Sequence, residues 1–570
     1  MKDPISILNA SMELADCRNK WTFDKKHDCW CLEDILYTEK ASVPKFQRLS
    51  IFVPEKLLHA DGTFPKEARE IPVVLENNSA GYMQMPHTWL DGPRCYAQQY
   101  LDHGLIYVTC GCRGRESRDE SGKLVGKAPA SLVDLKTAIR FLRHNRAVLP
   151  GDWNRLISVG WSAGGAMSSL LAVTGDNARY DAYLRENGAF MDESDAVFAA
   201  QIYCPIIDLE HADLAYEWMF RADKTCESSP AGPAETMTPF KEALSAKLAE
   251  RYIEYFNALG LKDPETGTQL ALNADGRSGS GYDYLMKCLD TSATDFLRRL
   301  SAGELPQTYT VQDYLAGNYT YQAPAPAPSG PPAAHHAGPG EALPDYHAGH
   351  GAALSGDLPP KPMSLGDLVS RPPKGVPYHG FEPPMAEYPG SNKRGWLLWD
   401  GEHAHISDLD AYVLCHRRRM KPCTAFDKLS MDSGENQAFG TPECDYVHFC
   451  NDVDGALAEL ETDFPQECAQ YRADFAGVAQ DAQLEERVCL TNPLNFIGTE
   501  ENSRQAQHYR IRVGASDADT SFSVSMTLAL KLANAGCGTV DYALVWDQPH
   551  SEADYPGEVL AWIDAITGRG

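Results

Sequence analysis

The pentapeptide Gly160-Trp161-Ser162-Ala163-Gly164 constrains the fold of this chain more than any other segment. A short apolar run at 156–159, typical of a buried strand, precedes it, and apolar residues at helical spacing follow it over 166–171. A strand, a tight turn that carries a serine, and a helix form the arrangement called a nucleophile elbow. Small residues at positions 160 and 164 let the strand and the helix approach closely. The segment therefore predicts that Ser162 is presented beside a helix N-terminus, whose amide groups face the oxygen that becomes negative during ester attack.

Apolar runs of strand length alternate with helical patterns over the first 210 residues. The predicted strands cover 49–53, 71–75, 105–108, 156–159 and 199–203. This alternation predicts a mostly parallel sheet with helices on both faces, which is the α/β class. The alternation stops near residue 208. It resumes late, with predicted strands at 510–513 and 540–546 and helices at 522–533 and 559–566.

The late return of the pattern predicts one α/β core made from two parts of the chain, 1–207 and 488–570. The intervening residues, 208–487, are interpreted as an inserted cap (lid) domain. An insertion that leaves the carboxyl edge of such a sheet lies over the place where ligands bind. Within it, 323–389 is rich in Pro, Ala, Gly and His, and we expect a long exposed loop or a disordered stretch there.

The composition excludes several kinds of partner. The 570 residues carry a formal net charge of −28, which argues against nucleic acid and anionic membranes, because phosphate binding needs clustered Lys and Arg. No apolar run has the length of a signal peptide or a membrane span, so we expect a cytoplasmic protein. The 16 Cys follow no repeating framework; we expect reduced thiols, no metal site and no cofactor. The oligomeric state stays open.

A serine nucleophile needs a base and an acid that orients the base. In this fold class the acid and then the histidine follow the serine, each on a loop after a late strand. The two late strands are followed by Asp517 and His550, which we predict as the acid and the base for Ser162. Asp519 is the alternative acid. Asp517 is preferred because it lies nearer the end of its strand.

The oxyanion of the intermediate needs two backbone N–H donors. We expect one from Ala163, the residue after the nucleophile. The other is expected from the loop after the strand at 71–75, where Gly81 is our first choice and Ala80 the alternative. The elbow, the order of its partners and the insertion together predict an α/β-hydrolase fold with a large inserted cap.

At this level of detail the chain resembles the bacterial tannases, or tannin acylhydrolases, which cleave galloyl esters. The resemblance covers the core and most of the insertion. Its motifs are Arg113-Gly114-Arg115, the elbow through Gly165, Tyr203-Cys204-Pro205-Ile206, 209–213, 215–218, Arg419-Met420-Lys421, Ala425-Phe426-Asp427, Glu435-Asn436, Asn492-Pro493-Leu494, 517–522 and Pro549-His550-Ser551.

The resemblance implies a carboxylic ester hydrolase with the triad Ser162, Asp517 and His550. It also implies that Lys421, Glu435 and Asp519 hold the galloyl hydroxyls and that Ile206 belongs to the substrate-binding residues. Carboxylates are strong acceptors for phenolic hydroxyls, which makes this set chemically reasonable. In smaller family members a Pro precedes the binding Glu, whereas here the residue is Gly434. We therefore expect that a flat apolar wall beside the ring is missing.

The leading prediction is a serine esterase that hydrolyses galloyl esters of tannins and simple gallates through an acyl-enzyme. Its expected partner is a small phenolic ester. One alternative keeps the triad in a feruloyl or general carboxylesterase. The other is a catalytically silent hydrolase-fold protein that binds a partner or a phenolic ligand.

Overall fold

The central element of the molecule is a nine-stranded sheet with the order β1-β2-β3-β5-β4-β6-β7-β12-β13. The structure is a computed structural model that describes residues 14, 20–77, 79–90, 96–226, 235–305, 307, 309–317, 395–416, 419–475, 483–499, 503–550 and 553–569. The strands are β1 (Thr22–Asp24), β2 (Cys29–Leu36), β3 (Arg48–Pro54), β4 (Pro72–Asn77), β5 (Ile106–Cys110), β6 (Asp152–Trp161), β7 (Ala199–Tyr203), β12 (His508–Gly514) and β13 (Thr539–Val545).

The strands from β4 onward are parallel, whereas β1, β2 and β3 pair antiparallel at one end of the sheet. The late strands join the early ones directly, because β12 pairs in parallel with β7 on one side and with β13 on the other. The predicted α/β class is confirmed. The antiparallel pair β1–β2 was not predicted, because Glu33 and Asp34 break the apolar pattern of β2.

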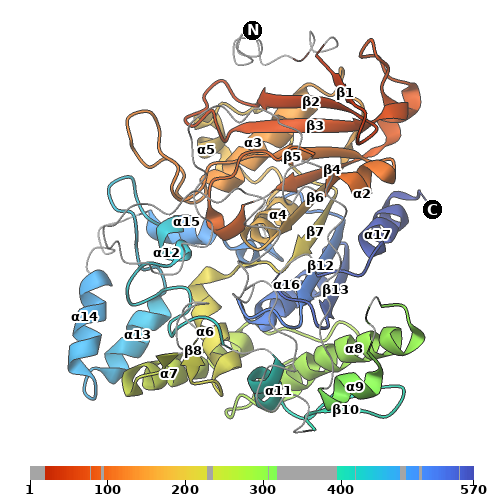
Figure 1. The fold of residues 1–570 in the computed structure, drawn as a ribbon. Helices are drawn as coiled ribbons and strands as arrows, with labels where there is room; N and C mark the ends of the chain where they lie inside the picture. The colour runs from red at the N-terminus through yellow and green to blue at the C-terminus, as the bar shows by residue number, and fades with distance from the viewer. Residues whose placement is uncertain are drawn as a thin grey trace, which may run out of the picture.

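Helices cover both faces of this sheet (Figure 1). One face packs against α3 (Ala130–His144), α4 (Ala163–Val173) and α16 (Phe522–Asn534), whose apolar residues join the larger buried cluster. The other face packs against α2 (Ala97–Asp102) and α17 (Glu558–Thr567) in a second cluster. The short helix α5 (Asp181–Glu186) packs against α3. Two apolar layers therefore hold the parallel strands in place.

The segment between β7 and β12 contains mainly helices, most of which lie below the sheet in Figure 1. Its helices are α6 (Leu209–Phe220), α7 (Pro239–Ala258), α8 (Ser280–Ala302), α9 (Val311–Ala316), α11 (Leu409–His416), α12 (Gly434–Ala438), α13 (Asn451–Leu460), α14 (Pro465–Phe475) and α15 (Leu484–Leu490). Two small antiparallel pairs, β8 (Thr225–Cys226) with β9 (Glu235–Thr236) and β10 (Leu397–Trp399) with β11 (Ala404–Ile406), complete it. The Pro-rich stretch 323–389 lies outside the described residues.

In the part of the chain that the structure describes, no helix is both long and apolar enough to cross a membrane.

Candidate active site

Ser162 lies at the sharp turn between β6 and α4, with backbone angles of φ 59° and ψ −128°. The two flanking glycines make this turn possible. A Cβ on Gly160 would lie 2.3 Å from the carbonyl oxygen of Gly164, and a Cβ on Gly164 would lie 2.9 Å from the carbonyl oxygen of Asn77. Both distances are too short for a real side chain. Ser162 therefore takes the strained conformation expected of a nucleophile elbow.

His550 follows β13 and brings its ring to Ser162. The ring atom Nε2 lies 2.9 Å from Ser162 Oγ, so the serine hydroxyl can donate its hydrogen to an unprotonated Nε2. The imidazole is largely buried, with 17% of its side chain exposed. The two residues are far apart in the chain, and the parallel pairing of β13, β12, β7 and β6 brings them together.

Asp517 holds the other side of the His550 ring. Its Oδ2 lies 2.8 Å from Nδ1, while its Oδ1 accepts a hydrogen bond of 2.9 Å from the backbone N–H of Asp519. The nearest Asp519 carboxylate oxygen lies 3.9 Å from Nδ1. Of the two predicted acids, Asp517 is thus the one in hydrogen-bond contact.

The carboxylates around His550 raise its pKa well above the usual value. Burial alone would lower the pKa, but the charges of Asp517 and Asp519 and the hydrogen bond to Asp517 outweigh it. An imidazole with a raised pKa is a stronger base once deprotonated, which suits proton abstraction from a serine.

The backbone around Ser162 is tied to the chain that follows β7. The N–H of Ser162 donates to the carbonyl of Tyr203 at 3.1 Å, and the N–H of Ile206 donates to the carbonyl of Ser162 at 3.2 Å. Ile206 is buried and its carbonyl accepts a 2.7 Å hydrogen bond from the Tyr82 hydroxyl. The predicted substrate-binding residue Ile206 is therefore beside the nucleophile.

The two candidate oxyanion donors lie on segments that pack together. Ala163 is the first residue of α4, where an amide has no acceptor within its own helix. Gly81 is in the short 3-10 helix η4 (Ala80–Tyr82), which packs against α4. Gly81 has φ 60°, and a Cβ there would meet only the Met83 side chain, at 4.0 Å. The space beside Gly81 is open to a substrate.

Lys421 is tied to the loop of Asp517 and Asp519 by Tyr216 of α6. The Tyr216 hydroxyl accepts the N–H groups of Met420 at 3.2 Å and Lys421 at 3.1 Å, and it donates to the carbonyl of Ala518 at 2.9 Å. The Lys421 ammonium lies 4.0 Å from the centre of the Phe426 ring. Tyr216 belongs to one of the family motifs, but the sequence does not predict its connecting role.

A buried ion pair supports the same segment. Arg419 and Glu217 form a two-pronged contact in which both side chains have no exposed surface. Arg419 Nη1 also donates to the carbonyl of Lys421 at 3.2 Å. The backbone that carries Lys421 is therefore held by charge-assisted hydrogen bonds.

Glu435 lies in the first turn of α12, which packs against η4 and so faces the segment of Gly81. Burial raises the pKa of Tyr82, and the charge of Glu435 adds to this effect, so the two side chains are close. Ser433 caps the helix by accepting the N–H of Asn436 at 3.1 Å.

A buried polar cluster lies beneath α12. The Asp427 carboxylate accepts hydrogen bonds from the Asn436 side chain and from the backbone N–H of Cys450, the latter at 3.2 Å, and it contacts His448 Nδ1. Asn436 also donates to the carbonyl of Val447 at 3.1 Å. Together these contacts hold the helix that carries Glu435.

The loop after β5 contacts the same helix from the core. Lys127 Nζ donates to the carbonyls of Gln437 at 2.8 Å and Asp445 at 3.0 Å, and the N–H of Ala128 donates to the carbonyl of Ala438 at 2.9 Å. Burial lowers the pKa of Lys127 to about 8. The helix that carries Glu435 is thereby attached to the loop after β5.

Within the described residues, two groups of side chains could hold a metal ion. One is Cys204 with Asp517 and His550, and a metal there would compete with the contact to Ser162. The other is Asp208, Glu210 and His211 in and before α6. Its carboxylates already accept hydrogen bonds from Asn492, at 2.8 Å each. Neither group is needed for the arrangement described above.

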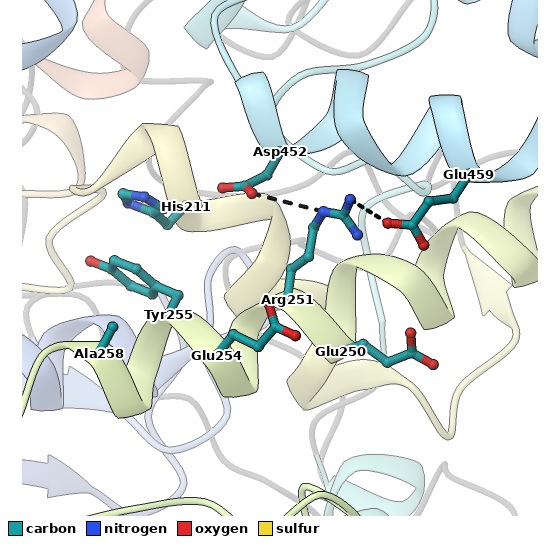
Figure 2. A pocket seen from close by; sticks show the side chains of 8 residues that line it. All are labelled: His211, Glu250, Arg251, Glu254, Tyr255, Ala258, Asp452 and Glu459. Carbon is teal, nitrogen blue, oxygen red and sulfur yellow. Dashed lines mark hydrogen bonds and ion pairs between the residues drawn. The ribbon is translucent and has the colours of Figure 1, made fainter.

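A pocket of about 560 Å³ lies between α6, α7 and α13 (Figure 2). His211 stacks on Tyr255 at one end, with ring centres 3.8 Å apart. Arg251 crosses the pocket to pair with Glu459 at 2.7 Å and Asp452 at 3.8 Å. The pocket contains none of the predicted site residues.

The fold and the serine elbow define an α/β hydrolase, and the family model BD-FAE matches residues 117–227, which include Ser162. Among solved structures, a tannin acyl hydrolase in complex with ethyl gallate is 30% identical with a TM-score of 0.67, over 95% of this chain and 94% of that chain. The native tannin acyl hydrolase from Lactobacillus plantarum is 29% identical with the same TM-score and coverage. The tannase of Fusobacterium nucleatum is 25% identical with a TM-score of 0.67, over 95% of each chain. This chain belongs to the bacterial tannase family. No curated protein sequence matches it.

Proposed function

We propose that this protein hydrolyses galloyl esters through an acyl-enzyme on Ser162. The observation that carries the proposal is the hydrogen-bonded chain Ser162–His550–Asp517. The Tyr216 hydroxyl links the backbone of Lys421 to the loop that carries Asp517 and Asp519. The family membership supports the same activity, since one relative was solved with ethyl gallate.

In the first half of the reaction, Ser162 Oγ attacks the ester carbonyl carbon and His550 Nε2 takes the serine proton. The negative charge on the carbonyl oxygen is stabilised by the N–H groups of Ala163 and Gly81. Collapse of the intermediate breaks the bond to the alcohol, which leaves with the proton from His550. Asp517 stabilises the imidazolium while it exists.

In the second half, a water molecule attacks the acyl carbon while His550 takes its proton. The ester bond to Ser162 then breaks, the serine recovers its hydrogen and gallate leaves. The acyl ring is held by Lys421, Glu435 and Asp519 through its three hydroxyls, with Ile206 against its face. Residues 208–487 act as the cap that completes this pocket.

A paired assay tests the proposal. The purified protein is given methyl gallate and methyl ferulate, and kcat/KM is measured for each. We expect methyl gallate to be preferred by at least about 100-fold, because the wrong acyl ring would leave Lys421, Glu435 and Asp519 without hydroxyl partners. Equal values would indicate a general carboxylesterase, and no turnover of either ester would indicate a silent hydrolase fold.

A further inference from the structure

Arg115 is a buried cation next to the residues proposed to bind the acyl ring. Only 8% of its surface is exposed. Among the residues that the structure describes, no carboxylate lies within 4 Å of its guanidinium, and its one side-chain hydrogen bond runs from Nε to the Met83 thioether at 2.9 Å. Buried charges are almost always paired, and a thioether is a weak acceptor.

The guanidinium lies directly against Gly434, the residue before Glu435. A Cβ on Gly434 would be 2.3 Å from Nη1 and 2.9 Å from Cζ of Arg115. Any side chain at position 434 would displace the guanidinium. A Pro at position 434 would form a flat apolar wall beside the acyl ring. Here the Arg115 guanidinium occupies that space.

A second cation lies near Arg115. Burial lowers the pKa of Lys127, and the charge of Arg115 lowers it further. The two cations therefore lie near each other. A ligand that brings electron density to this place would relieve the repulsion.

We propose that Arg115 is a specificity-determining residue of the acyl pocket, where its planar guanidinium lies on the hydroxylated ring of the substrate. A guanidinium is attracted to the face of an electron-rich ring and can donate to phenolic oxygens. Together with Lys421 it balances the charges of Glu435 and Asp519. This inference rests on the proposed function and adds a selective contact to it.

The first test replaces Arg115 with Met, which keeps an unbranched apolar stem and removes the guanidinium and its charge. We expect kcat/KM for methyl gallate to fall about 10- to 100-fold. We expect the value for p-nitrophenyl acetate, whose acyl group has no ring, to change less than about 2-fold. The matched control is Arg118→Met, an exposed arginine of the same loop that pairs with Asp445 at 3.4 Å. It should change neither value.

A second variant keeps the test valid if Arg115→Met folds poorly. Gly434→Ala leaves the arginine in the chain but pushes its guanidinium aside, so it should reduce gallate turnover in the same direction. Its effect should be much smaller when Arg115 is already Met, because both changes act on one contact. Equal losses on both esters, or no loss on either, would overturn the inference.

Gallate binding separates this inference from the proposed function. The inhibition constant of free gallate is measured against hydrolysis of p-nitrophenyl acetate. We expect it to rise about 10-fold or more in Arg115→Met and to be unchanged in Arg118→Met. If the wild type does not hydrolyse methyl gallate but gallate inhibits it more strongly than it inhibits Arg115→Met, the proposed function fails while the place of Arg115 in the acyl pocket holds. If gallate inhibits both variants equally, the inference fails on its own.

Discussion

The residues proposed for catalysis and those proposed for acyl binding are held in place by different means. Ser162, Asp517 and His550 lie just beyond the carboxyl ends of neighbouring parallel strands, so the ladder of β6, β7, β12 and β13 sets their positions. Lys421 and Glu435 lie in short or irregular segments between β11 and α13, held by buried side-chain contacts. Backbone pairing tolerates many substitutions, whereas a side-chain contact is lost with one. The chemistry should therefore be more robust to mutation than the specificity.

Replacing the nucleophile should have the largest effect and should not distinguish between substrates. In Ser162→Ala, turnover of both methyl gallate and p-nitrophenyl acetate should fall about 10⁴-fold or more, because no acyl-enzyme can form. The control is Ser169→Ala, a serine of the same helix whose hydroxyl bonds only to carbonyls of α4. Retained turnover in Ser162→Ala would contradict the mechanism.

Removal of an acyl-binding group should, in contrast, separate the two substrates. Lys421→Ala or Glu435→Ala should lower kcat/KM for methyl gallate by about 10- to 150-fold, the value of one charge-assisted hydrogen bond. Hydrolysis of p-nitrophenyl acetate should change less than about 3-fold. Glu443→Ala, an exposed carboxylate of the same segment, serves as control. Parallel losses on both esters would mean that these residues do not contact the acyl ring.

Weakening the buried support of α12 should have a smaller effect of the same kind. Asn436→Ala removes the link between Asp427 and the carbonyl of Val447. We expect KM for methyl gallate to rise about 10-fold, because Glu435 is less well positioned. The melting temperature is measured alongside, and kcat on p-nitrophenyl acetate should be retained. A loss of acetate turnover would point to a role in the whole fold.

The smallest predicted effect is a shift in the pH profile. His550 must be unprotonated to act as a base, so activity is lost as the pH falls through its pKa. Asp519 is one of the charges that raise this pKa. Asp519→Asn should therefore move the acid limb of kcat/KM for p-nitrophenyl acetate to lower pH, by about one unit. Glu435→Gln should leave the limb in place. A shift of the Asp519→Asn limb to higher pH would contradict the assignment.

The sequence predicted the sheet better than it predicted the acyl-binding region. The strand at 199–203 was predicted at its observed bounds, and the predicted run at 156–159 falls within the longer β6. Strands and elbows are local patterns, and their order in the chain restricts where a base and an acid can follow. Sequence order selected His550 and left Asp517 and Asp519 as candidate acids, of which Asp517 was preferred because it lies nearer the strand end; the structure brings Asp517 and His550 together with Ser162.

The supports of the acyl-binding residues could not be predicted in this way. Tyr216 joins Met420 and Lys421 to Ala518 across some 200 to 300 positions of the chain, and no local pattern indicates such a link. Arg115 was visible only as part of a motif. Its burial against Gly434 depends on how the loop after β5 meets α12, which is a property of the tertiary packing.

The strands β12 and β13, which join the sheet beside β7, are the last to be synthesised. During synthesis the elbow leaves the ribosome long before the two late strands, so the growing chain carries a serine hydroxyl with no base to activate it. On the proposed mechanism, the hydroxyl becomes reactive once β13, the strand that precedes His550, has been added to the edge of the sheet. A copy that ends before His550 should, on the same mechanism, be inert toward esters.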